Sequence, residues 1–134
     1  MPDRFDRKTR SRIMASIRGK NTQPELTVRR FLHARGLRFR LHNASLPGRP
    51  DIVLAKHRTV VFVHGCFWHG HANCRLASMP ASNRRFWREK LAGNRRRDRR
   101  KARALKKAGW KVLTIWQCQL DGKRLRRLTD RIRG

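Results

Sequence analysis

A strand-forming run near the middle of the chain leads directly into a loop rich in cysteine and histidine. Residues 61–74 read VFVHGCFWHGHANC, so metal-binding side chains begin where the β-branched run ends. Zinc prefers tetrahedral sets of thiolate and imidazole ligands, and Cys66, His71 and Cys74 supply three of them. The only other cysteine of the chain, Cys118, directly follows an apolar segment that strand pairing would bring alongside. We therefore predict a Cys3His zinc site that fixes this loop to the end of another strand.

Two alternatives for this loop stay open at the level of the sequence. His69 would replace His71 as the zinc ligand, because three histidines lie within the eight positions from His64 to His71. Alternatively, the three cysteines are buried thiols that hold no metal. Four protein ligands leave no coordination position for water, so a zinc ion held in this way would be structural rather than catalytic.

The charge of the chain restricts the class of partner. Its 36 Lys and Arg stand against 8 Asp and Glu, a formal net charge of +28, which favours a polyanion and above all nucleic acid. No apolar run approaches the roughly 20 residues of a membrane-spanning helix, and the N-terminus lacks a signal-peptide core. Few cysteines, clustered with histidines, also fit a reducing compartment. We therefore expect a cytoplasmic protein, with no membrane partner, folded as one domain over residues 1–134.

Hydrophobic periodicity and capping signals predict an α/β domain built on a mixed β-sheet flanked by helices. Helices are expected at 9–20, 22–36, 83–108 and 121–133, the third made of the stretches 83–93 and 94–108, and strands at 37–42, 51–55, 59–64 and 110–116. The second and third strands form an antiparallel hairpin through Lys56-His57-Arg58. Residues 43–50, which contain Pro47-Gly48 and Pro50, form a loop.

The hairpin brings a second group of polar residues together. Asp51 begins one of its strands and His64 ends the other, so both lie at the same end of the sheet. This arrangement resembles the PD-(D/E)xK nuclease superfamily, in which the aspartate after the proline binds magnesium. The second acidic residue of that superfamily is absent here, where Phe62-Val63-His64 occupies the corresponding positions. Taken alone, Asp51 is also explained as a turn or strand-edge residue.

The same segments resemble one family, the very short patch repair (Vsr) DNA mismatch endonucleases. The resemblance covers almost the whole chain, from about Thr9 to Cys118, in the same order. The matching segments are ASLPGRPD at 44–51, HGCFWH at 64–69, Phe86-Trp87, Glu89-Lys90, Asn94, DRR at 98–100, and 109–118. It implies a nuclease fold of the restriction-endonuclease type with a structural zinc site.

The resemblance also implies roles around a catalytic magnesium ion. Asp51 would bind the ion through its carboxylate, and Val63 through its main-chain carbonyl. His64 and His69 would lie beside the scissile phosphate, with His69 the better candidate for proton transfer. Glu25 would help to hold water at the ion, although the sequence Thr22-Gln23-Pro24-Glu25 also explains this residue as part of a capping box.

Contacts to the bases are implied as well. Phe67, Trp68 and Trp87 would wedge between base pairs beside the mismatch, and Lys90 and Asn94 would read base edges. A solvated helix face is the alternative for the last two. We also expect DNA contacts from an N-terminal helical segment, residues 1–20, through Met14 and Ile17. The basic helix at 119–134 receives no particular role.

Together these features predict a magnesium-dependent, zinc-stabilised enzyme that nicks one DNA strand 5′ to the thymine of a T·G mismatch. Such mismatches arise when 5-methylcytosine deaminates, and the nick would initiate very short patch repair. The expected partners are double-stranded DNA and mismatch-repair proteins, in a bacterial, nucleoid-associated setting, and a single nick is compatible with a monomer. Two alternatives remain: a noncatalytic zinc-containing DNA-binding module, and a restriction-type endonuclease that cuts matched DNA.

Overall fold

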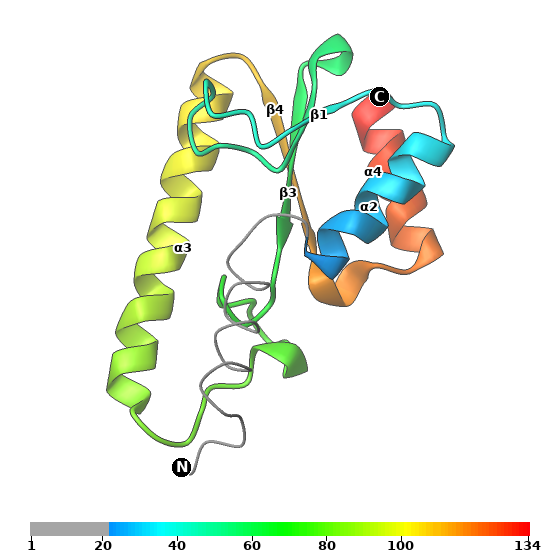
Figure 1. Ribbon diagram of the computed structural model, residues 1–134. Coiled ribbons are helices and arrows are strands. Elements are labelled where there is room, and N and C mark those ends of the chain that lie inside the picture. The colour runs from blue at the N-terminus through cyan, green and yellow to red at the C-terminus, as the bar shows by residue number, and fades with distance from the viewer. Residues whose placement is uncertain (1–21) are drawn as a thin grey trace.

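The computed structural model describes residues 22–134, which form a four-stranded sheet with helices on both faces (Figure 1). The strands are β1 (Arg40–Leu41), β2 (Ile52–Leu54), β3 (Thr59–His64) and β4 (Lys111–Trp116), in the spatial order β1-β2-β3-β4. The β1–β2 and β2–β3 pairs are antiparallel, and β3–β4 is parallel. The predicted mixed sheet and hairpin are therefore confirmed. The N-terminal segment with Met14 and Ile17 lies outside the described residues.

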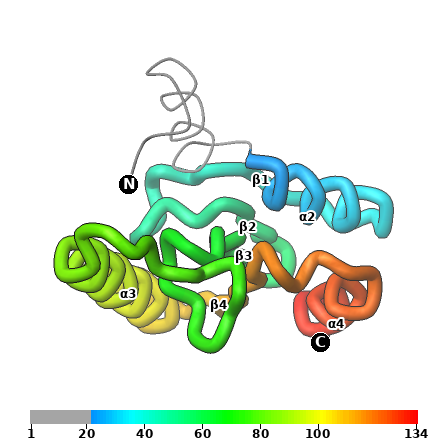
Figure 2. Tube along the Cα trace, turned by 90° about the horizontal axis from the view of Figure 1, so that it is seen from below, coloured from blue at the N-terminus to red at the C-terminus, as the bar shows by residue number. Residues whose placement is uncertain are grey.

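Alternating side chains of β3 and β4 build a core on each face of the sheet. Helix α3 (Arg84–Lys107) covers one face, whereas α2 (Gln23–Ala34) and α4 (Gly122–Arg133) cover the other (Figure 2). Val61, Leu113 and Ile115 pack toward α2 and α4, whereas Val60 and Phe62 pack toward Leu105 of α3. Because both faces are buried, β3 is apolar along most of its length.

The helices α2 and α4 begin at polar caps, as their sequences predict. Thr22 caps α2 by accepting a hydrogen bond from the backbone N–H of Glu25, and Asp121 caps α4 by accepting one from Arg124. Gly36 follows α2 with a φ of 77°, a left-handed conformation that costs glycine little. This geometry turns the chain from α2 toward the sheet.

One predicted boundary is wrong. The expected strand at 37–42 pairs only at Arg40–Leu41, because its partner β2 spans only three residues, between Asp51 and the 3-10 turn Ala55–His57. The single helix expected between the third and fourth strands is confirmed, because the stretches 83–93 and 94–108 are continuous in α3. An interior glycine such as Gly93 costs a helix only about 1 kcal/mol, and the packing of Leu91 and Leu105 holds both halves in place. Among the described residues, no helix combines the length and apolar character needed to cross a membrane.

Candidate active site

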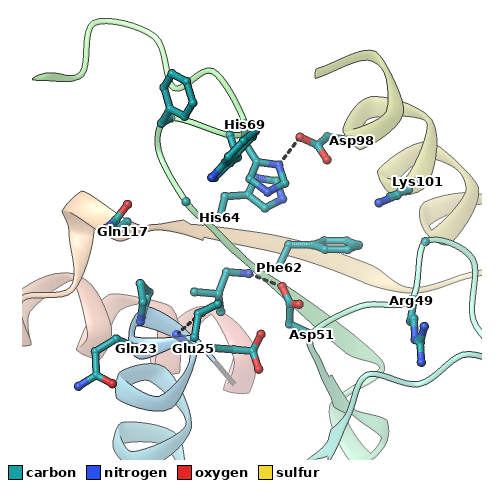
Figure 3. Close-up of a pocket in the computed structure, with 17 residues that line it drawn as sticks. Gln23, Glu25, Arg49, Asp51, Phe62, His64, His69, Asp98, Lys101 and Gln117 are labelled. Atoms are coloured by element: carbon teal, nitrogen blue, oxygen red, sulfur yellow. Dashed lines mark hydrogen bonds and ion pairs between the residues drawn. The ribbon is translucent and has the colours of Figure 1, made fainter. Parts of the chain in front are cut away.

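A cleft of about 670 Å³ opens where β3 ends, between the N-terminus of α2 and the middle of α3 (Figure 3). Carboxylates, histidines, cations and aromatic rings share its walls. Its lining includes Glu25, Arg49, Asp51, Val63, His64, Phe67, Trp68, His69, Asp98, Lys101 and Gln117. The structure thus gathers nearly all residues that the sequence analysis assigned to magnesium and phosphate.

Asp51 lies where the β2 and β3 backbones meet the cleft. Its Oδ2 accepts a hydrogen bond of 2.8 Å from the backbone N–H of Val63, which fixes the carboxylate against β3. Burial raises the pKa of Asp51 to about 6; the hydrogen bond from Val63 opposes this rise, and the negative charge of Glu25 adds to it. In such surroundings a nearby cation stabilises the ionised form of the carboxylate.

Glu25 supplies a second carboxylate to the same place. It lies in the first turn of α2 with 3% of its surface exposed, and Figure 3 shows its carboxylate near that of Asp51. Half of the predicted capping box is present, because the backbone N–H of Glu25 donates to the Thr22 hydroxyl oxygen. Ligand atoms of Glu25, Asp51 and His42 lie within 4.8 Å of one another. The buried carboxylate of Glu25 and the half-buried one of Asp51 provide oxygen ligands of the kind that magnesium prefers.

His64 and His69 form a stacked pair on the opposite side of the cleft. Their ring centroids are 3.8 Å apart and their planes differ by 1°. Burial, reinforced by the charge of His69, lowers the pKa of His64 to about 3, so its ring is neutral near pH 7. The Nδ1 atom of His64 is buried and has no hydrogen-bond partner within residues 22–134. Since imidazole lone pairs lie in the ring plane, two parallel rings cannot both point at one metal ion.

Asp98 orients the second histidine. Its Oδ2 lies 2.7 Å from Nδ1 of His69, across the gap between α3 and the loop after β3. Burial acts to raise the pKa of Asp98, but the hydrogen bond and the charge of His69 hold it below its ordinary value. An ionised carboxylate only accepts hydrogen bonds, so Nδ1 of His69 carries the proton and Nε2 has the lone pair. His69 is thereby prepared to accept a proton at Nε2.

The four predicted zinc ligands are brought together on the far side of the same loop. The ligand atoms of Cys66, His71, Cys74 and Cys118 lie within 4.8 Å of one another, with His71 Nδ1 3.4 Å from Cys118 Sγ. Of the two histidines considered, His71 joins the cysteines, whereas His69 bonds to Asp98. Burial raises the pKa of the Cys66 thiol to about 12, so this thiolate needs a bound cation to form near pH 7.

The aromatic residues assigned to DNA form one half-buried cluster beside the cleft. The rings of Phe67, Trp68 and Trp87 lie 5.2–5.9 Å apart, and Phe86, which is 57% exposed, extends the cluster from α3. Phe67 and Trp68 line the cleft itself.

Lys90 and Asn94 line a smaller pocket of about 210 Å³ beside Trp68. The Asn94 amide donates to the Trp68 carbonyl at 2.8 Å, and its oxygen accepts from Arg97. Asn94 therefore ties the aromatic loop to α3 as well as facing this pocket.

The loop at 43–50 brings Arg49 to the cleft beside Lys101 of α3. A Cβ on Gly48, which has a φ of 74°, would lie 2.6 Å from Cβ of Lys101, so only glycine allows the loop backbone to rest on that side chain. Arg49 and Lys101 consequently share the cleft with the two histidines. The positive charges of these two side chains suit the negatively charged oxygens of a phosphodiester.

Sequence reasoning gave no role to several polar residues of this site, among them Asp98, His42 and Arg29. Asp98 was noted only as part of a matching segment, although an acidic residue within an arginine-rich helix is a usable signal. His42 and Arg29 contact the Glu25 carboxylate and carry no motif. Their positions become meaningful only when α2 and β1 are placed side by side.

The sequence also matches known proteins and one protein family. Residues 2–75 match the family described as "DNA mismatch endonuclease Vsr". The chain is similar to the "Type II nicking enzyme V.XorIIP" of Xanthomonas oryzae pv. oryzae, with 48% identity over 97% of this chain and 98% of that protein. It is also similar to the "DNA mismatch endonuclease Vsr" of Escherichia coli K12, with 45% identity over 97% of this chain and 81% of that protein. The "Type II nicking enzyme V.NmeAIP" of Neisseria meningitidis is 44% identical over 99% of this chain and 98% of that protein.

Proposed function

Because the chain belongs to the Vsr family of DNA mismatch endonucleases, we propose that it nicks one strand of duplex DNA 5′ to the thymine of a T·G mismatch. Its relatives, which are named endonucleases and nicking enzymes, support the coarser statement that it is a DNA endonuclease. The nick would initiate very short patch repair of deaminated 5-methylcytosine.

One observation carries the catalytic part of the proposal. A pair of carboxylates, Asp51 and Glu25, faces a pair of stacked histidines, His64 and His69, across one cleft (Figure 3). Hydrolysis of a phosphodiester needs a group that takes a proton from water and positive charge beside the phosphate. His69 Nε2, oriented through Asp98, takes the proton of the attacking water. Neutral His64 lies against its ring, while Arg49 and Lys101 bind the phosphate oxygens.

We propose magnesium as the catalytic cofactor, held by the Asp51 carboxylate and the Val63 carbonyl, with Glu25 beside it. When bound, it would supply a Lewis acid that polarises the phosphate and stabilises negative charge on the phosphoryl oxygens. The pKa of about 6 for Asp51, raised by burial and by Glu25, supports a cation at this place, because a cation relieves the repulsion between the two carboxylates.

We propose a structural zinc ion at Cys66, His71, Cys74 and Cys118. Between Gly65 and Asn83 only Cys66 is buried, so the loop has almost no apolar core of its own. Zinc-finger peptides bind zinc with apparent free energies of roughly 10–16 kcal/mol, which is ample to order such a loop. The ion would attach the aromatic and histidine residues of this loop to the end of β4.

Recognition of the mismatch is assigned to the aromatic cluster. Unstacking a base step costs a few kcal/mol, and less where pairing is already defective. Insertion of Phe67 and Trp68 therefore favours a mismatch over a paired step, and Lys90 and Asn94 would contact the exposed base edges. The many cations of α3 would bind phosphates regardless of sequence.

A strand-resolved nicking assay tests this function. Wild-type protein and Asp51→Ala are compared on T·G and matched duplexes of the same sequence, with magnesium or with EDTA. We expect one magnesium-dependent nick in the thymine strand of the T·G duplex, and none from Asp51→Ala. Tight binding to the T·G duplex without any nick would instead support a noncatalytic DNA-binding module.

A second candidate, nicking of correctly paired DNA, is favoured by the names of the relatives that are Type II nicking enzymes. Equal cutting of matched and mismatched duplexes in the same assay would support it. The charge of the chain fits both candidates, so only the substrate comparison separates them.

A further inference from the structure

The Glu25 carboxylate is held by two side chains that the proposed chemistry does not use. Arg29 follows one turn later on α2, and its Nη2 donates to Glu25 Oε2. The Nε2 atom of His42 lies 2.8 Å from the same oxygen and 3.0 Å from Arg29 Nη2. All three side chains are at most 13% exposed. A carboxylate only accepts hydrogen bonds, so His42 Nε2 donates to Glu25 when it carries the ring proton. Arg29 Nη2 and His42 Nε2 are then both donors to the same oxygen and do not bond to each other.

His42 also contacts the other carboxylate residue, through its backbone. It follows β1 directly, and its N–H donates to the carbonyl of Asp51 at 3.1 Å. Its φ of 48° is left-handed, a conformation that is uncommon outside glycine but that His, Asn and Asp adopt more often than other residues. This turn directs the chain away from the β1–β2 ladder at Asp51. One residue therefore joins Asp51, through its main chain, to Glu25, through its ring.

We propose that His42 and Arg29 are positioning residues that hold the Glu25 carboxylate beside Asp51 for the catalytic ion. The inference rests on the proposed function, in which Asp51 binds magnesium. Hydrogen bonds to a ligand or to its neighbour orient it, and their loss commonly costs 10- to 100-fold in metal affinity or activity. Arg29 adds a positive charge that offsets the repulsion between the carboxylates of Glu25 and Asp51. His42 sets the direction of the Glu25 carboxylate.

The test compares His42→Leu, which removes the donor, with His42→Gln, whose amide N–H can replace ring Nε2–H. His33→Leu is the matched control, because His33 is an exposed histidine on α2, the helix that carries Glu25 and Arg29. Three quantities are measured: the single-turnover nicking rate at saturating magnesium, magnesium binding to the DNA-free protein by calorimetry, and the melting temperature. A double-mutant cycle with Glu25→Gln follows.

We expect His42→Leu to slow nicking and weaken magnesium binding by about 10- to 100-fold, and His42→Gln to restore both to within about threefold. In the Glu25→Gln background, His42→Leu should have little further effect, because His42 acts through Glu25. Full additivity of the two changes would overturn the proposal. Equal losses of nicking rate and magnesium affinity in His42→Leu and His42→Gln would also overturn it. So would a lowered melting temperature in His42→Leu with unchanged nicking rate and magnesium affinity. If the wild type does not nick DNA, the proposed function fails, and calorimetry on the same variants still decides the role of His42.

Discussion

Replacing Asp98 by asparagine should slow catalysis without impairing DNA binding. The substitution keeps the shape of the side chain but removes the charge that stabilises His69 once that ring has taken a proton. Hydrogen bonds to charged groups are worth about 1.5–3 kcal/mol. The His69 and Asp98 side chains are 29% and 18% exposed, so solvent screening favours the lower half of that range. Because about 1.4 kcal/mol is a factor of ten in rate, we expect a loss of about 10- to 50-fold.

Single-turnover nicking of a T·G duplex at saturating magnesium measures this loss, because it isolates the chemical step from product release. DNA affinity in calcium, measured by anisotropy, should stay within about twofold of the wild type. Asp130→Asn on the exposed side of α4 removes the same charge away from the cleft and serves as the control. An unchanged rate in Asp98→Asn would refute the role of Asp98 in orienting and stabilising His69. A loss equal to that in Asp130→Asn would show only an effect of net charge.

Substitutions at Asp51, Cys118 and Phe67 test the other parts of the site. Asp51→Asn should stabilise the metal-free protein at pH 8 by on the order of 2–3 kcal/mol, because the pKa of Asp51 rises from 3.8 to about 6 on folding. In the wild type, the free energy of unfolding falls relative to Asp51→Asn as the pH rises from about 4 through about 6, because the half-buried carboxyl must ionise. Below about pH 4 the two proteins should therefore be equally stable. Equal stability at pH 8 would contradict the burial of this charge. Cys118→Ala should lower the zinc content from about one ion per chain to near zero, and a chelator that changes neither zinc content nor melting would exclude the zinc site. Phe67→Ala should weaken binding to a T·G duplex by about 10- to 100-fold with little effect on matched duplex, and equal losses on both would remove Phe67 from mismatch recognition.

The sequence predicted elements whose signals are local. The β-branched run of β3 and the largely apolar run of β4 define their strands, and Thr22 and Asp121 mark the starts of two helices. The predicted strand at 37–42 was too long because the alternation of apolar and polar residues indicates which side chains are buried, not which backbone groups pair in the sheet. Leu37 is indeed buried, but it packs against the core without a partner in the sheet.

The candidate site was predictable only where its residues lie close together in the sequence or in a motif. The cysteine and histidine spacing brought His71 and Cys74 into one prediction, and the resemblance supplied Asp51 and Glu25. The Asp98–His69 contact spans 29 positions and the His42–Glu25 contact spans 17. Both depend on how helices pack beside the sheet, which no local pattern encodes.

We propose that this cleft distinguishes a T·G mismatch from paired DNA during catalysis. The most direct measurement places a T·G duplex and its matched counterpart, labelled differently, in one reaction with magnesium and follows both strands of each. We expect one nick, 5′ to the mismatched thymine, and a kcat/KM at least about 100-fold above that for matched DNA, the ratio that a few kcal/mol of cheaper unstacking provides. Equal rates on the two duplexes, or an uncut T·G duplex, would contradict it.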